Sequence, residues 1–248
     1  MGTQPLHESR PDVVDHTQLQ ASLTLSRSRV HIWCVALDRQ NPEPATSLLS
    51  RDERERAERF HFPRDRRRFE SARSALRVIL SRYLGAPAGD LRFEYSPHGK
   101  PALAPPADLT FNLSHSGEMA LVAVARGRAV GVDIERVRDA DISALAHAAF
   151  SDREQAALGT IPSEKQLEAF FRGWVRKEAY IKARSEGLAL HIEQIEVSLE
   201  RAPALLSTPH SPDDVLRFVL HDLDVAPGYL AAMAVEHGFE LLEYFEYV

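Results

Sequence analysis

Two acidic side chains lie close together in the stretch Gly131-Val132-Asp133-Ile134-Glu135. Side chains alternate between the two faces of an extended strand, so Asp133 and Glu135 share one face, roughly 7 Å apart. Val132 and Ile134 would then face a core. The pattern predicts a strand with one apolar face and one face that presents two carboxylates. A lone Asp-x-Glu is also typical of the solvent-facing side of a strand.

A third carboxylate belongs to the stretch Trp174-Val175-Arg176-Lys177-Glu178-Ala179-Tyr180-Ile181-Lys182. In a helix, Trp174, Glu178 and Lys182 form one stripe because they are four residues apart. Lys177 lies about 100° around the helix from Glu178 and should point elsewhere. Plainer interpretations are an ordinary helix pair for Glu178 and Lys182, worth a few tenths of a kcal/mol, and a core aromatic for Trp174.

Three carboxylates from these two elements could hold a hard divalent cation if the fold brings the elements together. Oxygen ligands suit magnesium and make a poor zinc site. Mg²⁺ usually keeps several waters and binds through a couple of carboxylates plus substrate phosphates. The sequence therefore predicts a magnesium site made by Asp133, Glu135 and Glu178, with Lys182 near an anionic ligand.

Two segments upstream could also contact an anion. The segment Ser114-His115-Ser116-Gly117 reads as a turn between two strands, and His115 could donate to a phosphate. A lone histidine is more often structural. Gly99 and Lys100 combine close backbone approach with an ammonium group.

The composition limits the protein class. The chain has 248 residues, of which 44% are hydrophobic and 27% charged, as in ordinary globular proteins. The single cysteine, Cys34, excludes an intramolecular disulfide framework and a cysteine-based zinc cluster. No apolar run approaches the length of a membrane span, and Met1 to Arg29 lacks the apolar core of a signal peptide. We expect a cytoplasmic protein with a loose leader.

The basic residues are unevenly distributed. The net charge of −6 argues against general nucleic-acid affinity, yet residues 51–82 hold eleven arginines against six acids. This block is either a solvated helical face or a source of phosphate ligands. The chain has 26 arginines but only four lysines, at positions 100, 165, 177 and 182. Because the chain uses arginine at most cationic positions, a lysine suggests that the position needs an ammonium group rather than a guanidinium.

The periodicity predicts an α+β protein with a boundary near Arg126-Gly127-Arg128. Ser50 is the expected N-cap of a charged helical segment that follows it, and Pro63 interrupts that segment. The expected helices are 66–84, which ends at Gly85, then 141–149, 151–158 and 164–185, the last closing at Gly187. The expected strands are 30–37, 91–95, 109–113, 119–125, 130–135, 192–199, 215–222, 228–236 and 239–247. Both halves place helices before strands, which is weak evidence for duplication.

Several motifs together resemble one family. Phe111 to Gly117 (FNLSHSG), then Gly131 to Glu135, then W-x-x-K-E-A-x-x-K from Trp174 occur in the order and spacing of the Sfp-type 4′-phosphopantetheinyl transferases. The loop Gly99-Lys100-Pro101 and the arginine-rich segment Arg59 to Arg73 match as well. The resemblance covers about residues 30–235.

The resemblance implies a pseudo-dimer of two similar α/β halves, with the active site and coenzyme A in the cleft between them. Residues 1–29 would be the leader. Residues 30–127 would form the N-terminal half, on the coenzyme A nucleotide side. Residues 128–248 would form the C-terminal half, with the metal and the catalytic helix. A duplicated chain already supplies both halves, so we expect a monomer.

The resemblance also implies roles for particular residues. Asp133, Glu135 and Glu178 would bind Mg²⁺, and Glu178, Lys182 and His115 would take part in catalysis. The coenzyme A ligands would be Arg68, Arg73, Gly99, Lys100, Pro101, Asn112, Ser114, His115 and Lys182. A family position that often carries a basic residue falls on Glu53 here, so nucleotide contacts in that segment differ.

The implied reaction moves 4′-phosphopantetheine from coenzyme A to a serine of an acyl or peptidyl carrier protein and releases adenosine 3′,5′-bisphosphate. The serine hydroxyl must lose its proton as it attacks, and Glu178 is the candidate base, directly or through a metal-bound water. Lys182 would stabilise charge on the phosphates. The two-half form resembles the members of secondary metabolism. The sequence does not identify the carrier.

Two other functions fit parts of the pattern. A metal-dependent nuclease or phosphohydrolase also uses acids and a lysine, but its lysine usually follows the second acid by two residues on one strand. Here Arg136 and Val137 follow Glu135. A non-catalytic protein could instead bind an acidic partner with its arginine face. We expect coenzyme A and a carrier protein as partners, and neither nucleic acid nor a membrane.

Overall fold

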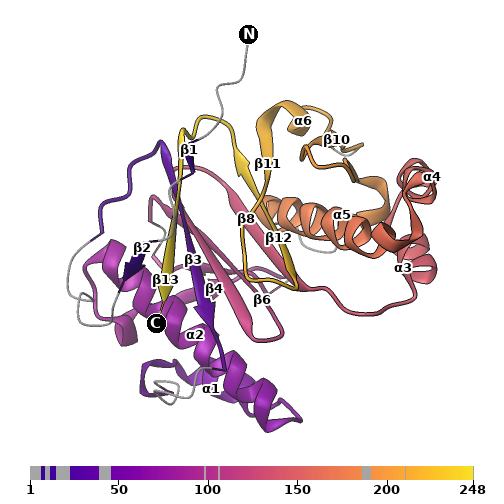
Figure 1. The fold of residues 1–248 in the computed structure, drawn as a ribbon. Helices are drawn as coiled ribbons and strands as arrows, with labels where there is room; N and C mark the ends of the chain where they lie inside the picture. Colours follow the sequence, from indigo (N-terminus) through magenta and orange to yellow (C-terminus); the bar gives the residue numbers. More distant parts are fainter. Residues whose placement is uncertain are drawn as a thin grey trace. The chain divides into compact units, whose positions relative to one another are not determined.

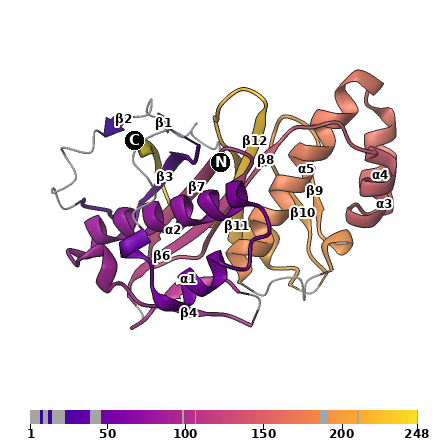
Figure 2. The ribbon, with the colours of Figure 1, turned by 90° about the horizontal axis from the view of Figure 1, so that it is seen from below.

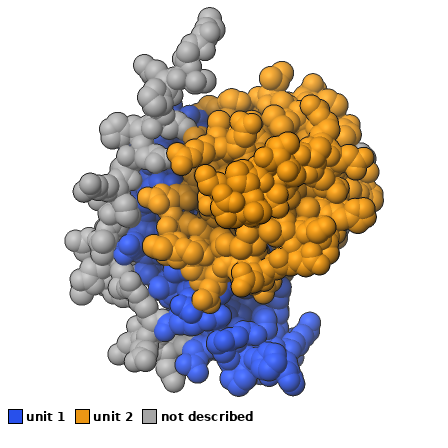
Figure 3. All heavy atoms as spheres, turned by 45° about the vertical axis from the view of Figure 1, so that its right-hand side comes forward, with its two compact units in different colours: residues 1–94, 101–127, 239–248 blue, residues 95–100, 128–238 orange. Residues whose placement is uncertain are grey.

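The computed structural model describes residues 7–8, 12–14, 23–38, 46–97, 99–105, 107–185, 191–209 and 211–247 (Figure 1). The chain forms two compact units, coloured separately in Figure 3. Unit 1 comprises residues 1–94, 101–127 and 239–248, and unit 2 comprises residues 95–100 and 128–238. The chain passes from unit 1 to unit 2 between residues 127 and 128, but residues 95–100, expected in the N-terminal half, belong to unit 2. Residues 239–248, expected in the C-terminal half, belong to unit 1.

Unit 1 is a sheet with one long helix, α2 (Pro63–Leu84), against one face (Figure 2). The sheet has the order β1-β13-β3-β7-β6, and β2 also pairs with β13. Alternate residues of β3 and β7, such as Trp33 and Val122, pack on apolar residues of α2 such as Leu76. The strands are β1 (His7–Glu8), β2 (Asp12–Val14), β3 (Arg29–Ala36), β6 (Leu109–Ser116), β7 (Met119–Arg126) and β13 (Leu241–Tyr247).

Local sequence signals fix the helix ends in unit 1. Ser50 and Glu53 form a capping box at the start of α1 (Arg51–Ala57). Pro63 occupies the first turn of α2, where its missing N–H costs nothing, and Gly85 ends that helix with a φ of 63°. The short elements are η2 (Thr46–Leu48), η3 (Ala88–Asp90), β4 (Phe93–Tyr95) and β5 (Pro101–Leu103).

Unit 2 is an antiparallel sheet of order β11-β12-β8 that carries the long helix α5 (Ser163–Arg184). Strands β9 and β10 form a separate antiparallel pair. The elements are β8 (Val130–Arg136), α3 (Ile142–Ala149), α4 (Asp152–Thr160), η5 (Ile192–Gln194), β9 (Glu196–Val197), β10 (Leu205–Ser207), α6 (Asp214–Arg217), β11 (Phe218–Asp222) and β12 (Tyr229–Glu236).

The two units repeat one topology. In unit 1, a strand (β3) precedes a 22-residue helix (α2), the small β4-β5 sheet and the hairpin β6-β7. In unit 2, a strand (β8) precedes a 22-residue helix (α5), the small β9-β10 sheet and the pair β11-β12. In both cases the first strand pairs antiparallel with the last. The expected α+β fold of two similar halves is confirmed.

Some predicted elements are wrong in detail. Ser114, His115 and Ser116 lie in β6, because the turn is displaced to Gly117-Glu118. The expected strand 215–222 begins as the helical turn α6. The predicted stop at Gly187 lies outside the described residues, and Ser185 caps α5 with a φ of 63°. None of the helices in the described part of the chain has the length and apolar character needed to cross a bilayer.

Candidate active site

The two motif elements of unit 2 are in direct backbone contact at Gly131. A methyl group there would lie 2.1 Å from the carbonyl oxygen of Ala179 and 2.3 Å from the amide nitrogen of Ala183. Only glycine leaves room for this approach of α5 to β8. Because strand side chains alternate, the face of Gly131 is also the face of Asp133 and Glu135. The carboxylates therefore lie on the helix side of β8.

Both faces of β8 are buried over residues 130–134. Val132 and Ile134 are fully buried on the opposite face, as the alternation predicts. Asp133 is only 3% exposed, so a solvent-facing strand side is excluded for this residue. Glu135, nearer the end of the strand, is half-buried.

Asp133 and Lys182 join the strand to the helix. The ammonium Nζ of Lys182 lies 2.5 Å from Asp133 Oδ1. Glu178 lies one turn before Lys182 on α5 and is half-buried. Burial raises the pKa of Glu178, and the carboxylates of Asp133 and Glu135 raise it further, while Lys182 lowers it in part. Asp133 and Glu135 thus disfavour the ionised form of Glu178, and the three carboxylates outnumber the one ammonium group of Lys182.

A second lysine reaches the C-terminal end of α5. Lys100 Nζ lies 2.5 Å from the carbonyl oxygen of Lys182 and 2.8 Å from Ser185 Oγ. Burial, together with the charge of Lys182, lowers the pKa of Lys100 to about 8. The loop around it is tight: Ser96 accepts from the Gly99 amide, and Gly99 has a φ of 79°, which favours glycine.

The opposite side of α5 is held by buried polar contacts. Lys177 is fully buried, pairs with Glu154 at 2.5 Å and donates to the carbonyl oxygen of Ala149 at 2.7 Å. Lys177 therefore points away from Glu178 and the carboxylates of β8, as predicted. Near the C-terminal end of the helix, Tyr180 donates to Asp214 at 2.6 Å, and Arg184 pairs with the same carboxylate.

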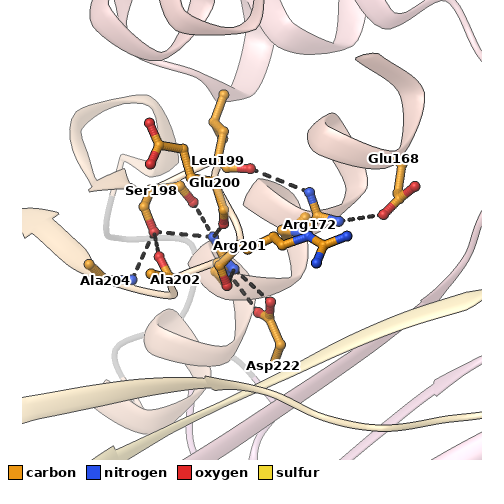
Figure 4. A network of polar contacts seen from close by, with 10 residues as sticks. Glu168, Arg172, Ser198, Leu199, Glu200, Arg201, Ala202, Ala204 and Asp222 are labelled. Carbon is orange, nitrogen blue, oxygen red and sulfur yellow. Dashed lines mark hydrogen bonds and ion pairs between the residues drawn. The ribbon is translucent and has the colours of Figure 1, made fainter. Parts of the chain in front are cut away.

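The middle of α5 is fixed by Arg176, whose side chain is fully buried. It contacts both carboxylate oxygens of Asp222, at 2.7 and 2.6 Å, and donates to the carbonyl oxygen of Glu200 at 2.8 Å. Figure 4 shows the segment Ser198 to Ala202, which contains Glu200, beside Arg172. Arg172 pairs with Glu168 and donates to the Leu199 carbonyl oxygen. These contacts position the helix so that Glu178 and Lys182 face β8.

Trp174 packs against the core of unit 2 and is itself partly buried. It contacts two apolar clusters and stacks on Phe170, with ring centroids 6.3 Å apart. This packing favours the interpretation of Trp174 as a core aromatic.

The remaining candidate residues lie in unit 1. Asn112 and Ser114 are buried in β6, whereas His115 is exposed in the same strand. Pro101 begins β5. Arg68, on the second turn of α2, forms a bidentate pair with Asp38.

Arg73 has a different environment from Arg68. It is 5% exposed and donates from Nε to Glu53 at 2.7 Å, and Arg77 donates to the other oxygen of Glu53 at 2.7 Å. Burial favours the neutral acid, but the two arginines and the Ser50 amide lower the pKa of Glu53 overall. Glu53 is thus the buried counter-ion of this helix pair, which accounts for an acid where the family often has a base.

No three His, Cys, Asp or Glu side chains in the described ranges are arranged as a ready-made metal site. The donor chemistry nevertheless suits magnesium, because Asp133, Glu135 and Glu178 offer oxygen ligands and the first two lie close enough to raise the pKa of Glu178. Magnesium commonly binds through one or two protein carboxylates and completes its shell with water and phosphate.

Several structural residues carried no clear sequence signal. Glu154 and Asp214 lie in the first turns of α4 and α6, and Asp222 ends β11, so only the fold reveals that they hold α5. Gly131 did carry a signal, since a glycine within a strand often marks close backbone approach.

Comparison with known proteins identifies the family. Residues 129–234 match the model of the 4′-phosphopantetheinyl transferase superfamily, and residues 38–127 match the 4′-phosphopantetheinyl transferase N-terminal model. The 4′-phosphopantetheinyl transferase HetI of Nostoc sp. is 42% identical over 79% of this chain and 86% of its own length. The 4′-phosphopantetheinyl transferase Sfp of Bacillus subtilis is 28% identical over 81% of this chain and 88% of its own length.

Among solved structures, a holo-(acyl-carrier-protein) synthase from Bacillus anthracis in complex with CoA (3′,5′-ADP) is 19% identical, with a TM-score of 0.35. That match covers 44% of this chain and 94% of the solved chain. The two family models and the 42% identical relative show that the chain belongs to the 4′-phosphopantetheinyl transferase superfamily.

Proposed function

We propose that this protein transfers 4′-phosphopantetheine from coenzyme A to a serine hydroxyl of an acyl or peptidyl carrier protein, with Mg²⁺. Family membership supports the reaction class. The observation that carries the proposal is the group of Asp133, Glu135, Glu178 and Lys182 on the facing sides of β8 and α5. A nuclease is not favoured, because the matching families are transferases.

In the proposed reaction the serine oxygen attacks the phosphorus that carries pantetheine. The bond from that phosphorus to the bridging oxygen breaks, and adenosine 3′,5′-bisphosphate leaves with the bond's electron pair. Glu178 accepts the serine proton, directly or through a water. Burial and neighbouring carboxylates raise its pKa, which makes it a stronger base than an exposed glutamate.

Lys182 and the three carboxylates have different electrostatic roles in the proposed reaction. Asp133, Glu135 and Glu178 would hold Mg²⁺, which when bound neutralises charge on the pyrophosphate. Lys182 now pairs with Asp133, and a bound phosphate would compete for its ammonium group. The lysine would then stabilise the charge that develops on the leaving phosphate.

We further propose that the N-terminal half binds the coenzyme A nucleotide and the C-terminal half provides the metal ligands and the catalytic helix. Arg68 is the preferred ligand for the 3′-phosphate because it is half-buried near the surface. Both arginines are paired, but the pair of Arg68 with Asp38 lies near the surface, where a phosphate could compete for the guanidinium, whereas the pair of Arg73 with Glu53 is buried. His115 is exposed and could donate to a phosphate, together with Ser114 and Asn112. Gly99, Lys100 and Pro101 would line the nucleotide end.

Labelling of a carrier tests the proposal directly. Purified protein, an apo carrier protein and a fluorescent coenzyme A are combined with Mg²⁺, with EDTA, or with a carrier whose acceptor serine is alanine. Unlabelled coenzyme A should increase the carrier mass by about 340 Da, as one phosphopantetheine group does in a two-substrate transfer. Labelling that is unaffected by EDTA would contradict the metal dependence, and failure to label any carrier type would contradict the function.

A further inference from the structure

The turn between α1 and α2 exposes a large aromatic side chain beside several cations. Phe62, the N-cap residue of α2, is 60% exposed. The ring of His61 stands at 79° to it, with centroids 4.8 Å apart. Arg59 and Arg64 flank this pair in sequence and are also exposed. We refer to residues Arg59 to Arg67 as the Phe62 corner.

The Phe62 corner is positively charged for a structural reason. Nearby acids pair with some arginines of these helices: Arg51 pairs with Glu55, and Arg66, within the corner, pairs with Glu70. Asp38 has three arginines around it, and its pKa is lowered mainly by Arg68 and also by Arg64 and Arg67. Asp65 also pairs with Arg64 at 3.6 Å, and Glu118 lies 3.9 Å from Arg68. The Phe62 corner nevertheless holds four arginines against one acid, Asp65.

This local charge contrasts with the rest of the chain. Residues 51–82 carry eleven arginines and six acids, a balance of +5, within a protein of net charge −6. The remainder therefore has a balance of −11. General attraction to polyanions is opposed by that remainder, so the excess of positive charge belongs to the segment 51–82.

The Phe62 corner is preorganised by the residues beneath it. Phe60 packs on Phe69 with ring centroids 5.3 Å apart, and the guanidinium of Arg56 lies 5.5 Å from the same ring. The amide nitrogens of Phe60 and Arg66 donate to the backbone carbonyls of Ala57 and Phe62. A partner would therefore order few protein groups on binding, which lowers the cost of association.

We propose that the Phe62 corner docks the carrier protein through an acidic face of the carrier that bears an apolar side chain for Phe62. The inference rests on the proposed function, since the carrier is the protein substrate of that reaction. Aromatic and arginine side chains together are typical of protein–protein hot spots. Charge complementarity assigns an acidic partner and would also speed the encounter.

Two variants at exposed positions test the surface: Phe62→Ala and Arg59→Glu. Arg153→Glu is the matched control, because its side chain is 85% exposed on α4 in unit 2 and it makes the same charge change. Fluorescence anisotropy gives the Kd for a labelled apo carrier at 50 and 500 mM NaCl. Steady-state kinetics give separate KM values for carrier and coenzyme A, and thermal denaturation verifies folding.

Each test variant should weaken carrier binding about tenfold at low salt, as loss of a hot-spot contact does. The effect of Arg59→Glu should shrink at high salt, while that of Phe62→Ala should persist. The KM for coenzyme A and kcat should stay within about twofold of wild type, the range of a surface change. Unchanged carrier affinity, an equal loss in Arg153→Glu, or a rise confined to the KM for coenzyme A would overturn the inference. Carrier binding without group transfer by the wild type would instead overturn the proposed function.

Discussion

Gly131 of β8 and Ala179 of α5 touch through their backbones, and a methyl group on the glycine would lie 2.1 Å from the Ala179 carbonyl oxygen. Gly131→Ala must push α5 away from β8, because the obstacle is backbone and cannot rotate aside. Overpacking of this kind typically costs about 1–3 kcal/mol of unfolding free energy. Since the same displacement separates Lys182 from Asp133, activity should fall more than stability. Urea unfolding and carrier labelling measure the two effects.

Gly159→Ala is the control for that experiment. Gly159 lies in α4, and no atom is within 4 Å of a Cβ at this position. Alanine should leave stability unchanged or raise it by up to about 1 kcal/mol, because glycine is a poor helix former. An equal loss in both variants would show that the contact with α5 has no special importance.

Glu178→Gln should abolish most turnover and leave the protein folded. The amide is nearly isosteric with the carboxylate but can neither accept the serine proton nor bind a metal as an anion. A lost general base usually costs about 100-fold or more in kcat. Single-turnover labelling measures the rate, and Glu168→Gln, an exposed position on the same helix, is the control. Wild-type turnover in Glu178→Gln would remove this residue from the mechanism.

Lys182→Ala should lower kcat by about 100-fold, as expected when one charge-stabilising donor is lost from a transition state. Lys165→Ala serves as the comparison, because Lys165 is an exposed lysine near the start of α5. The two variants differ only in where the ammonium is removed. If Lys182→Ala loads the carrier as fast as wild type, the contact with Asp133 is structural alone.

The local periodicity was sufficient to predict the two elements of the site. Strand alternation placed Asp133 and Glu135 on one face of β8, and the structure agrees, since Val132 and Ile134 are buried on the other. Helical spacing likewise placed Lys177 away from Glu178, and Lys177 is found in a buried pair with Glu154. These relationships depend only on the geometry of single elements.

Relationships between distant segments could not be predicted in this way. The last strand, β13, pairs in parallel with β3 and so returns to unit 1, although its sequence follows unit 2 directly. The contact of Lys100 with Ser185 joins residues 85 positions apart. The local pattern of apolar and polar residues contains no information on which strand β13 will pair with or which residue Lys100 will contact. His115 was placed in a turn because its polar neighbours resemble a loop, whereas pairing with β7 extends the strand through it.

Glu53→Gln should destabilise the protein strongly. The buried carboxylate neutralises Arg73 and Arg77, and removing one partner leaves buried charge without compensation. Such changes cost about 3–5 kcal/mol. Glu55→Gln removes an exposed partner of Arg51 in the same helix and should cost less than about 1 kcal/mol. Chemical denaturation of the two variants gives the difference, and similar values would contradict a structural role for the buried acid.

Stability should also decrease in mildly acidic solution because of His31. This residue is 2% exposed, its Nδ1 lies 2.8 Å from the Tyr83 hydroxyl, and its Nε2 lies 2.9 Å from Glu243. Burial lowers the pKa of His31 to about 4, although Glu243 opposes the shift. In the unfolded chain the same imidazole has a pKa of about 6.5.

The sign of the effect follows from these two pKa values. Between about pH 6.5 and pH 4 the unfolded chain binds a proton that the folded protein excludes, so the unfolding free energy falls as the pH falls. The loss is at most about 1.4 kcal/mol per pH unit, or about 3 kcal/mol across the window. Urea denaturation at pH 7.5, 6 and 5 should show a smaller slope for His31→Gln than for wild type, because glutamine does not titrate. Parallel slopes would mean that the pKa of His31 is about the same in the folded and the unfolded chain, so that Glu243 offsets its burial.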